Sequence, residues 1–230
     1  MRRLKKFLAN NRVTHSLYLK LYAIKYRKQC QKTRAVIQKQ GFEIIGILQS
    51  VLEQLDITFF FDMGTLLGIV REGKLLGHDL DIDTAVIVET DDDIEMVTEK
   101  LIQNECVHKY RYIVDGIGIV EDSFIIKGVK FDVNYYQHNG ENDICYLGYK
   151  KDNQNYEEGT MNVVSLTCPR VSDVVKIQVN GKSINIPSNP EQYLANRYGD
   201  NWRVPDKNYI YWRGPSASPI DNMCKQIIYK

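Results

Sequence analysis

The segment from Phe59 to Val88, FFFDMGTLLGIVREGKLLGHDLDIDTAVIV, constrains the fold more than any other part of the chain. It begins with a short aromatic run and ends with a longer apolar one, so we expect two buried strands joined by a turn-rich connection. Asp81 and Asp83 stand two residues apart in the second strand, where alternate side chains share a face. Their carboxylates therefore lie together and repel each other unless a cation lies between them.

A later strand carries a third acid. In the run VKFDVNYY, Phe131 and Val133 alternate with Lys130, Asp132 and Asn134, so the two sets face opposite sides of a strand. If this strand lies beside the first, Asp132 can complete a cage for a hard divalent cation or accept the proton of an attacking hydroxyl group. This pattern predicts phosphoryl transfer, in which a cation neutralises developing charge. The predicted catalytic residues are Asp81, Asp83 and Asp132, and the predicted ligands of Mg²⁺, or of Mn²⁺ in its place, are Asp79, Asp81, Asp83 and Asp132.

A glycine-threonine turn ahead of the acid pair predicts a phosphate-binding element. Gly64 and Thr65 follow the first strand and begin a short helix, whose exposed N–H groups can bind an anion. Arg71 and Lys74 lie between this turn and the acids, close enough to reach the same phosphates. A D-x-D pair alone is common at strand ends, but its combination with this turn, the basic loop and a later strand-borne acid favours a functional site.

The rest of the chain predicts an α+β fold class, a mixed sheet flanked by helices. Helical spacing and capping residues predict helices over 37–55, after Thr90, and over 190–198 before Gly199. Strand-like runs lie between them, at residues 108–114, 116–128, 129–137, 144–149, 159–166, 175–181 and 183–187. An aromatic and basic cluster is expected to pack the tail on the body rather than to stack a sugar or cytosine ring, and it comprises Trp202, Tyr209, Tyr211, Trp212 and Arg213.

The beginning of the chain is strongly basic. Up to Lys39 there are 12 Lys or Arg and no Asp or Glu, whereas the remainder carries 18 basic and 29 acidic residues. We therefore divide the chain into a basic amphipathic helical arm, 1–35, and a catalytic domain, 36–230. The arm is expected to pack on the body through its Leu/Tyr stripe; the alternative is peripheral contact with an anionic membrane. A nucleic-acid partner is not expected, because the body is net acidic.

Cysteine usage and hydropathy bear on the compartment. Five cysteines are scattered, and none forms a C-x-x-C pair, which argues against a disulfide framework and favours a reducing compartment. We find no secretory signal and no apolar stretch long enough to span a bilayer. The expected location is the cytoplasm. If the basic arm contacts an anionic membrane, the protein would be attached peripherally to the inner membrane face.

The segment FFFDMGTLLGIVREGKLLGHDLDID resembles the signature of the LicD family, which includes the fukutin-type proteins. The run VKFDVNYY resembles that family's later acid-bearing strand, and PSNPEQYLANRYGDNWRVP its closing segment, so the likeness spans roughly 40–205. His78 departs from the pattern, because a Trp is usual there; a histidine alters substrate stacking or carries a proton near neutral pH. Leu80 also departs, where many members have Asp. The matching residues are Asp62, Gly64, Thr65, Leu66, Leu67, Gly68, Arg71, Asp79, Asp81 and Asp83.

The resemblance implies a fold, a reaction and its partners. The family is a branch of the nucleotidyltransferase superfamily, with a DNA polymerase β-type fold. It implies transfer of a substituted phosphate, such as phosphocholine or ribitol phosphate, from a CDP-activated donor to a hydroxyl of a surface glycan or its lipid-linked precursor, with CMP leaving. The implied substrate-binding residues are Gly64, Thr65, Arg71, Lys74 and His78. Two alternatives stay open: a nucleotidyltransferase that moves NMP from an NTP and releases pyrophosphate, and a non-catalytic module that binds membrane or nucleic acid.

Overall fold

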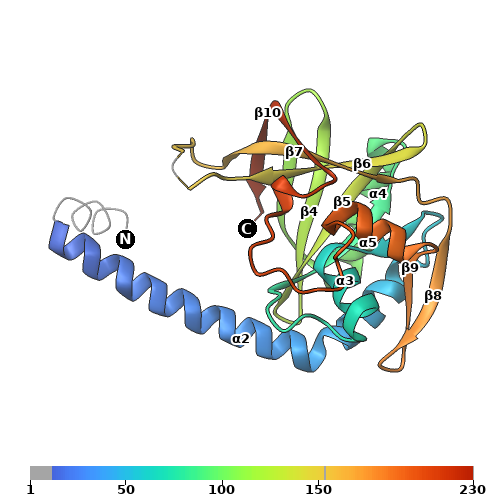
Figure 1. The fold of residues 1–230 in the computed structure, drawn as a ribbon, viewed down its shortest axis with the longest axis horizontal. Helices are drawn as coiled ribbons and strands as arrows, with labels where there is room; N and C mark the ends of the chain where they lie inside the picture. Colours follow the sequence, from blue (N-terminus) through green and yellow to red (C-terminus); the bar gives the residue numbers. More distant parts are fainter. Residues whose placement is uncertain (1–11, 153, 230) are drawn as a thin grey trace.

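A computed structural model describes residues 12–152 and 154–229, with side chains from Tyr18 onwards. The described chain is α+β, as predicted, with a large mixed sheet flanked by four helices (Figure 1). The helices are α2 (Arg12–Leu52), α3 (Met63–Glu72), α4 (Asp91–Gln103) and α5 (Pro190–Tyr198), with a short 3-10 helix η1 (Tyr211–Arg213). The strands are β1 (Phe59–Phe61), β2 (Asp81–Ile87), β3 (Val107–Val114), β4 (Gly118–Ile126), β5 (Val129–Asn139), β6 (Asn142–Tyr149), β7 (Thr160–Pro169), β8 (Val174–Val179), β9 (Lys182–Pro187) and β10 (Ala217–Ile228).

The main sheet has eight strands in the order β1-β2-β5-β4-β3-β10-β7-β6. The β2–β5 pair is parallel, and the other pairs along this order are antiparallel. The end of β5 also pairs with β6, so the strands from β5 to β6 in this order curl round and meet, while β2 and β1 extend the sheet beyond β5. β8 and β9 form a separate hairpin beside α2 and β1. The curled sheet therefore has a concave face on which side chains from distant strands converge.

Helix α4 begins as its sequence predicts. Thr90 and Asp93 form a reciprocal capping box, which satisfies backbone N–H groups that have no partner in the first turn. The buried side of the helix carries Ile94, Val97 and Leu101, which pack into the main hydrophobic core. This stripe holds α4 against β3 and β4, on the face of the sheet opposite the concave one.

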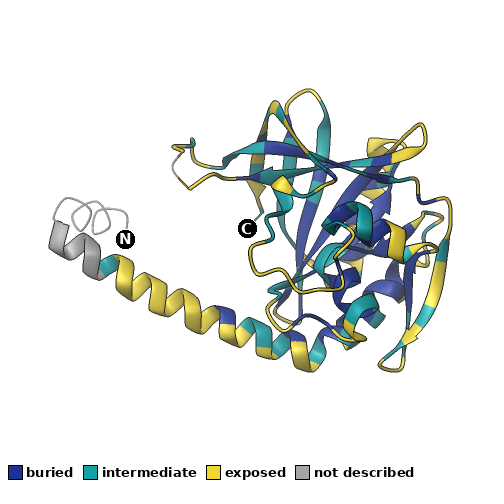
Figure 2. Ribbon diagram, viewed as in Figure 1, coloured by how far each residue is buried: buried dark blue, intermediate teal, exposed yellow. Residues whose placement is uncertain are grey.

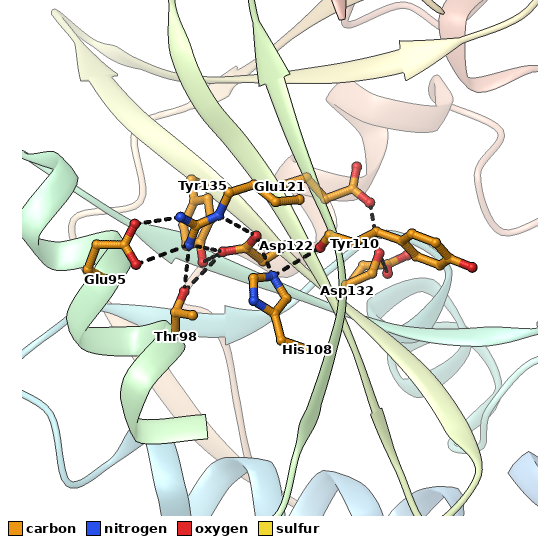
Figure 3. A network of polar contacts seen from close by, with 10 residues as sticks. Glu95, Thr98, His108, Tyr110, Glu121, Asp122, Asp132 and Tyr135 are labelled. Carbon is orange, nitrogen blue, oxygen red and sulfur yellow. Dashed lines mark hydrogen bonds and ion pairs between the residues drawn. The ribbon is translucent and has the colours of Figure 1, made fainter. Parts of the chain in front are cut away.

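A buried ionic network links α4 to the strands beneath it (Figure 3). Arg111 donates from Nε and Nη2 to the two carboxylate oxygens of Asp122, at 2.9 Å each. Asp122 is fully buried and also accepts hydrogen bonds from the Thr98 and Tyr135 hydroxyl groups, while His108 Nε2 lies 2.9 Å from its Oδ1. Every lone pair of the buried carboxylate thus has a polar partner, which is what allows a charge to remain in the interior.

Helix α2 is continuous from the expected arm into the core (Figure 1). Its exposed half projects from the body (Figure 2), whereas its contribution of fully buried side chains to the hydrophobic core begins at Ile37. The stripe was predicted from Val13, Leu17, Tyr18, Leu21, Tyr22, Ile24 and Tyr26, and the side chains of Val13 and Leu17 lie outside the described ones. The expected packing is wrong for most of the others, because Leu21, Tyr22, Ile24 and Tyr26 are 59%, 59%, 51% and 55% exposed, and only Tyr18 among the described members is partly buried. Helical spacing alone cannot distinguish a stripe that packs from one that faces solvent. Membrane contact and the division at residue 35 stay predictions.

The tail forms a strand that the sequence analysis did not identify. β10 lies between β3 and β7, and a bulge between Ile220 and Met223 interrupts its register with β7. It was missed because its sequence, ASPIDNMCKQII, is polar and contains a proline, both unusual inside a sheet. All five cysteines are free and buried, in agreement with the prediction of no disulfides. No helix among the described residues is long and apolar enough to cross a membrane.

Candidate active site

The parallel pairing of β2 and β5 brings the three predicted acids together. Asp83 lies directly opposite Asp132, and Asp81 lies opposite Lys130. Because alternate residues of a strand share a face, all four side chains project to the same side of the sheet. Ile82, between the two acids of β2, is fully buried on the opposite side. The pairing of β2 with β5 thus places the acids of two distant sequence segments on one surface.

These acids line a large cleft on the concave side of the curled sheet. The cleft has a volume of about 1330 Å³ and reaches from the start of α3 to the segment that precedes β10. Asp79, Asp81, Asp83, Glu121 and Asp132 provide its acidic floor. Its other wall is formed by residues 197–212, whose aromatic members in the cleft are Tyr198, Trp202, Tyr209, Tyr211 and Trp212. The tail cluster therefore lines the cleft as well as packing on the body, with the exception of Arg213.

A lysine lies between two of the acids. Lys130 Nζ is 2.9 Å from Asp81 Oδ2 and 2.6 Å from Asp132 Oδ2. The other oxygen of Asp132 accepts a hydrogen bond of 2.5 Å from the Ser123 hydroxyl. Although burial lowers the pKa of Lys130, the Asp132 and Asp81 carboxylates outweigh it and hold that pKa above its usual value. The lysine is therefore a permanent cation within the acidic floor.

The floor nonetheless has more carboxyl groups than this lysine can neutralise, and burial and mutual repulsion raise the pKa values of several of them. Burial, and then the charges of Asp81 and Asp132, raise the pKa of Asp83 well above its usual value. Burial, and then Asp132, raise the pKa of Glu121 to about 8. Burial, and then Asp81, raise the pKa of Asp79 to about 7. One ammonium group does not balance so many crowded carboxylates, and a further cation would relieve their repulsion.

The carboxylates of the floor are suitable ligands for a hard divalent cation, but in this structure they are not arranged around a metal position. Carboxylate oxygens are the ligands that Mg²⁺ and Mn²⁺ take in phosphate-handling sites, together with oxygens of the substrate. Among the residues that the structure describes, no three His, Cys, Asp or Glu side chains are arranged to hold a metal ion. The ammonium of Lys130 lies between Asp81 and Asp132, where such a cation would need their oxygens. The charge and the oxygen atoms of these acids suit a divalent cation, which could bind there once the Lys130 ammonium has moved away from Asp81 and Asp132.

The glycine-threonine turn lies beside the acids, but its two residues differ in what they contact. Gly64 lines the cleft, and a Cβ there would be 2.9 Å from Asp79 Oδ2, so only glycine leaves space for that carboxylate. Thr65 is buried, and its Oγ1 accepts a hydrogen bond of 3.0 Å from the backbone N–H of Asp83. Met63 has a left-handed φ of 50°, a strained conformation of the kind found at functional sites. The turn is thus attached to the acid strand through Thr65.

The basic residues after the turn do not all reach the cleft. Arg71 lines it, donates to the Trp202 carbonyl at 3.4 Å and pairs with Glu72. Lys74 is exposed, lies near Glu72, and is not part of the lining. His78 lines the mouth with an exposed ring, 3.7 Å from Asp79. Of the predicted substrate-binding residues, the structure brings Gly64, Arg71 and His78 to the cleft and leaves Thr65 and Lys74 outside its lining.

Sequence analysis assigned no role to several charged residues at the cleft: Glu121, Arg197, Asp206 and Lys207 line it, and Lys130 contacts two of its lining acids. Glu121 and Lys130 lie on strands, and their alternation with core residues was the signal that could have identified them. Arg197 on α5 is 2% exposed, lies 3.5 Å from the Asp62 carboxylate and donates to the Tyr136 hydroxyl at 2.7 Å. Its Nε and Nη1 have no hydrogen-bond partner within the described part of the chain. No local pattern indicates that α5 returns to the cleft.

Gly68 of the signature has a packing role, which leads to a prediction. A Cβ at Gly68 would be 2.6 Å from the Lys74 carbonyl oxygen and 3.0 Å from the Leu76 nitrogen, so the loop that leads to β2 packs on α3 at this residue. We expect Gly68→Ala to lower the free energy of unfolding by about 1–3 kcal/mol, because backbone must move. Urea denaturation measures this. Gly77→Ala is the control, since a Cβ there has no neighbour within 4 Å, and an equal loss in both variants would contradict the explanation.

Comparison with known families agrees with this geometry. The family model described as LicD/FKTN/FKRP, nucleotidyltransferase domain, matches residues 56–189. That family implies a transferase of phosphate-containing groups. The match covers more than half of the chain, and the protein belongs to the LicD family, as its motif indicated. The family suggests phosphotransferase activity on glycans in general. No curated protein was found to match the chain.

Proposed function

We propose that this protein transfers a substituted phosphate from a CDP-activated donor to a hydroxyl group of a glycan or its lipid-linked precursor. The observation that carries the proposal is the convergence of Asp81, Asp83 and Asp132 on one face of the β2–β5 pair, in a cleft large enough for a nucleotide and part of a sugar. Family membership supports the transfer of a phosphate-containing group. The choice of CDP-linked donor follows from the resemblance of the sequence motif.

The acids of the floor would hold a divalent cation against the donor diphosphate. Asp81 and Asp83 are its main ligands in this proposal, and Asp79 and Asp132 border the same space. When bound, Mg²⁺ supplies positive charge that stabilises the charge developing on the phosphate oxygens. The residues of the chain determine where the diphosphate lies, because their carboxylates are fixed on a paired strand.

Positive charge for the donor phosphates comes from the wall of the cleft. Arg71 lies at the end of α3 with its guanidinium in the cleft, and such a group binds phosphate oxygens in pairs. Arg197 provides a second, buried guanidinium with two nitrogens that have no partner in the described chain. Thr65 acts indirectly in this proposal, by holding the Asp83 backbone through its hydroxyl oxygen.

Asp132 is the proposed base. The acceptor hydroxyl oxygen attacks the phosphorus atom distal to the cytidine, its proton passes to the Asp132 carboxylate, and the bond between that phosphorus and the bridging oxygen breaks. CMP leaves with the electron pair of the broken bond, and the substituted phosphate remains on the glycan. Ser123 donates a hydrogen bond to Asp132 Oδ1 and so fixes the orientation of this carboxylate.

A panel of donors tests the proposal. We expect the purified protein with Mg²⁺ and an acceptor glycan to release CMP from one of CDP-choline, CDP-ribitol and CDP-glycerol. Release of pyrophosphate from a nucleoside triphosphate, with no CMP from the panel, would replace the proposal by nucleotidyl transfer. If neither product forms with any donor or acceptor offered, the protein is not the transferase proposed. Chromatography of the nucleotide products distinguishes these outcomes.

A further inference from the structure

Lys130 is fixed at the centre of the acidic floor by the register of the sheet. It lies opposite Asp81 in the parallel β2–β5 pair and two residues before Asp132 on the same face of β5. Its ammonium therefore bridges a carboxylate of each strand, 2.9 Å from Asp81 and 2.6 Å from Asp132. Lys130 is not itself part of the cleft lining, but both carboxylates that it contacts are, and its side chain is 35% exposed.

The two oxygens that Lys130 contacts are ones that a divalent cation would need. Mg²⁺ binds carboxylate oxygens at about 2.0–2.1 Å, a distance that leaves no space for an ammonium group between the same two carboxylates. The ammonium and the cation also repel each other at such a separation. Occupation by one therefore opposes occupation by the other.

We propose that Lys130 is an internal counter-ion that competes with the divalent cation, so that the cation binds tightly only together with the donor diphosphate. This inference rests on the proposed function. A diphosphate brings the negative charge that the displaced ammonium requires, and the long flexible stem of lysine allows the ammonium to turn from Asp81 and Asp132 to a phosphate oxygen. Cation and donor then increase each other's affinity by the same factor, as linkage requires.

Binding of Mn²⁺, measured by electron paramagnetic resonance on the full chain with and without CDP, tests the inference. Without CDP, we expect Lys130→Met to bind Mn²⁺ about tenfold more tightly than the wild type, a factor within the usual range for coupled sites. Addition of CDP should raise the Mn²⁺ affinity of the wild type more than that of Lys130→Met. Lys130→Arg keeps the positive charge between the acids and should behave like the wild type.

Lys127→Met is the matched control. Lys127 lies in the turn between β4 and β5, pairs with Glu43 at 2.5 Å and is outside the lining of the cleft, so its removal should leave Mn²⁺ affinity unchanged. Thermal unfolding with and without Mn²⁺ verifies that each variant is folded and gives a second readout of affinity. If Lys130→Met binds Mn²⁺ no more tightly than the wild type, the inference is overturned while the proposed function stands. If no variant binds Mn²⁺ even with CDP, the metal site of the proposed function is overturned as well.

Discussion

Asp83→Asn is expected to lower kcat for release of CMP by about a hundredfold to a thousandfold, the scale seen when one preorganised electrostatic group is removed. Asparagine keeps the size of the side chain but removes the charge that lies opposite Asp132 and beside Asp81 in the floor. The same change should leave the melting temperature unchanged or raise it, because a half-buried carboxylate among like charges opposes folding. A loss of activity together with an equal or higher stability indicates a functional residue.

The matched control is Asp115→Asn, in an exposed turn between β3 and β4 where the carboxylate pairs with Lys225 at the surface. It should change kcat by less than about twofold, since surface substitutions have small effects. Steady-state release of CMP, together with thermal unfolding of both variants, measures the contrast. A wild-type rate for Asp83→Asn would remove the acidic floor from the mechanism.

Arg111→Met is expected to lower the free energy of unfolding by about 3–5 kcal/mol, which is the usual effect of breaking a buried ion pair from one side. The substitution leaves the fully buried Asp122 carboxylate without its two strongest hydrogen bonds. Lys225→Met breaks an exposed pair with Asp115 and should cost less than about 1 kcal/mol. Guanidinium denaturation measures both. Equal effects in the two variants would show that the Asp122 network contributes no more than a surface pair.

The same network gives the stability a defined dependence on pH. Burial raises the pKa of Asp122, but the hydrogen bonds from His108 and Arg111 outweigh it and hold that pKa below its usual value. A carboxyl group with a lowered pKa in the folded state stabilises the fold above its unfolded pKa of about 3.9. This contribution is lost as the pH falls through the folded value. The wild type should therefore lose more stability than Arg111→Met between about pH 5 and pH 2.

The sequence predicted which side of each strand carries the acids, but not how the strands are arranged. A two-residue period is enough to place Asp81 with Asp83, and Asp132 with Lys130, because backbone geometry sets that alternation. That β2 and β5 are parallel neighbours depends on the path of the whole chain and has no local signature. For the same reason the return of Arg197 to the cleft could not be predicted.

Local sequence patterns gave a wrong prediction where the same pattern is compatible with two structures. The stripe of α2 that includes Tyr22 has the same spacing whether the helix packs or faces solvent, and in the described part of the chain this stretch of the helix lies away from the body. β10 was missed for a different reason: its polar sequence lacks the apolar alternation typical of a strand. It is a strand because its backbone pairs with both β3 and β7. The proposed likeness to the polymerase β-type fold and the roles of the acids stay predictions.

The unbroken course of α2 has a mechanical consequence for the enzyme. At about 1.5 Å per residue, its first 25 residues extend some 37 Å before the helix enters the core. Because no hinge separates the two halves, the tilt of the projecting half also sets the direction in which the cleft opens. Any surface that holds this helix would therefore also orient the cleft.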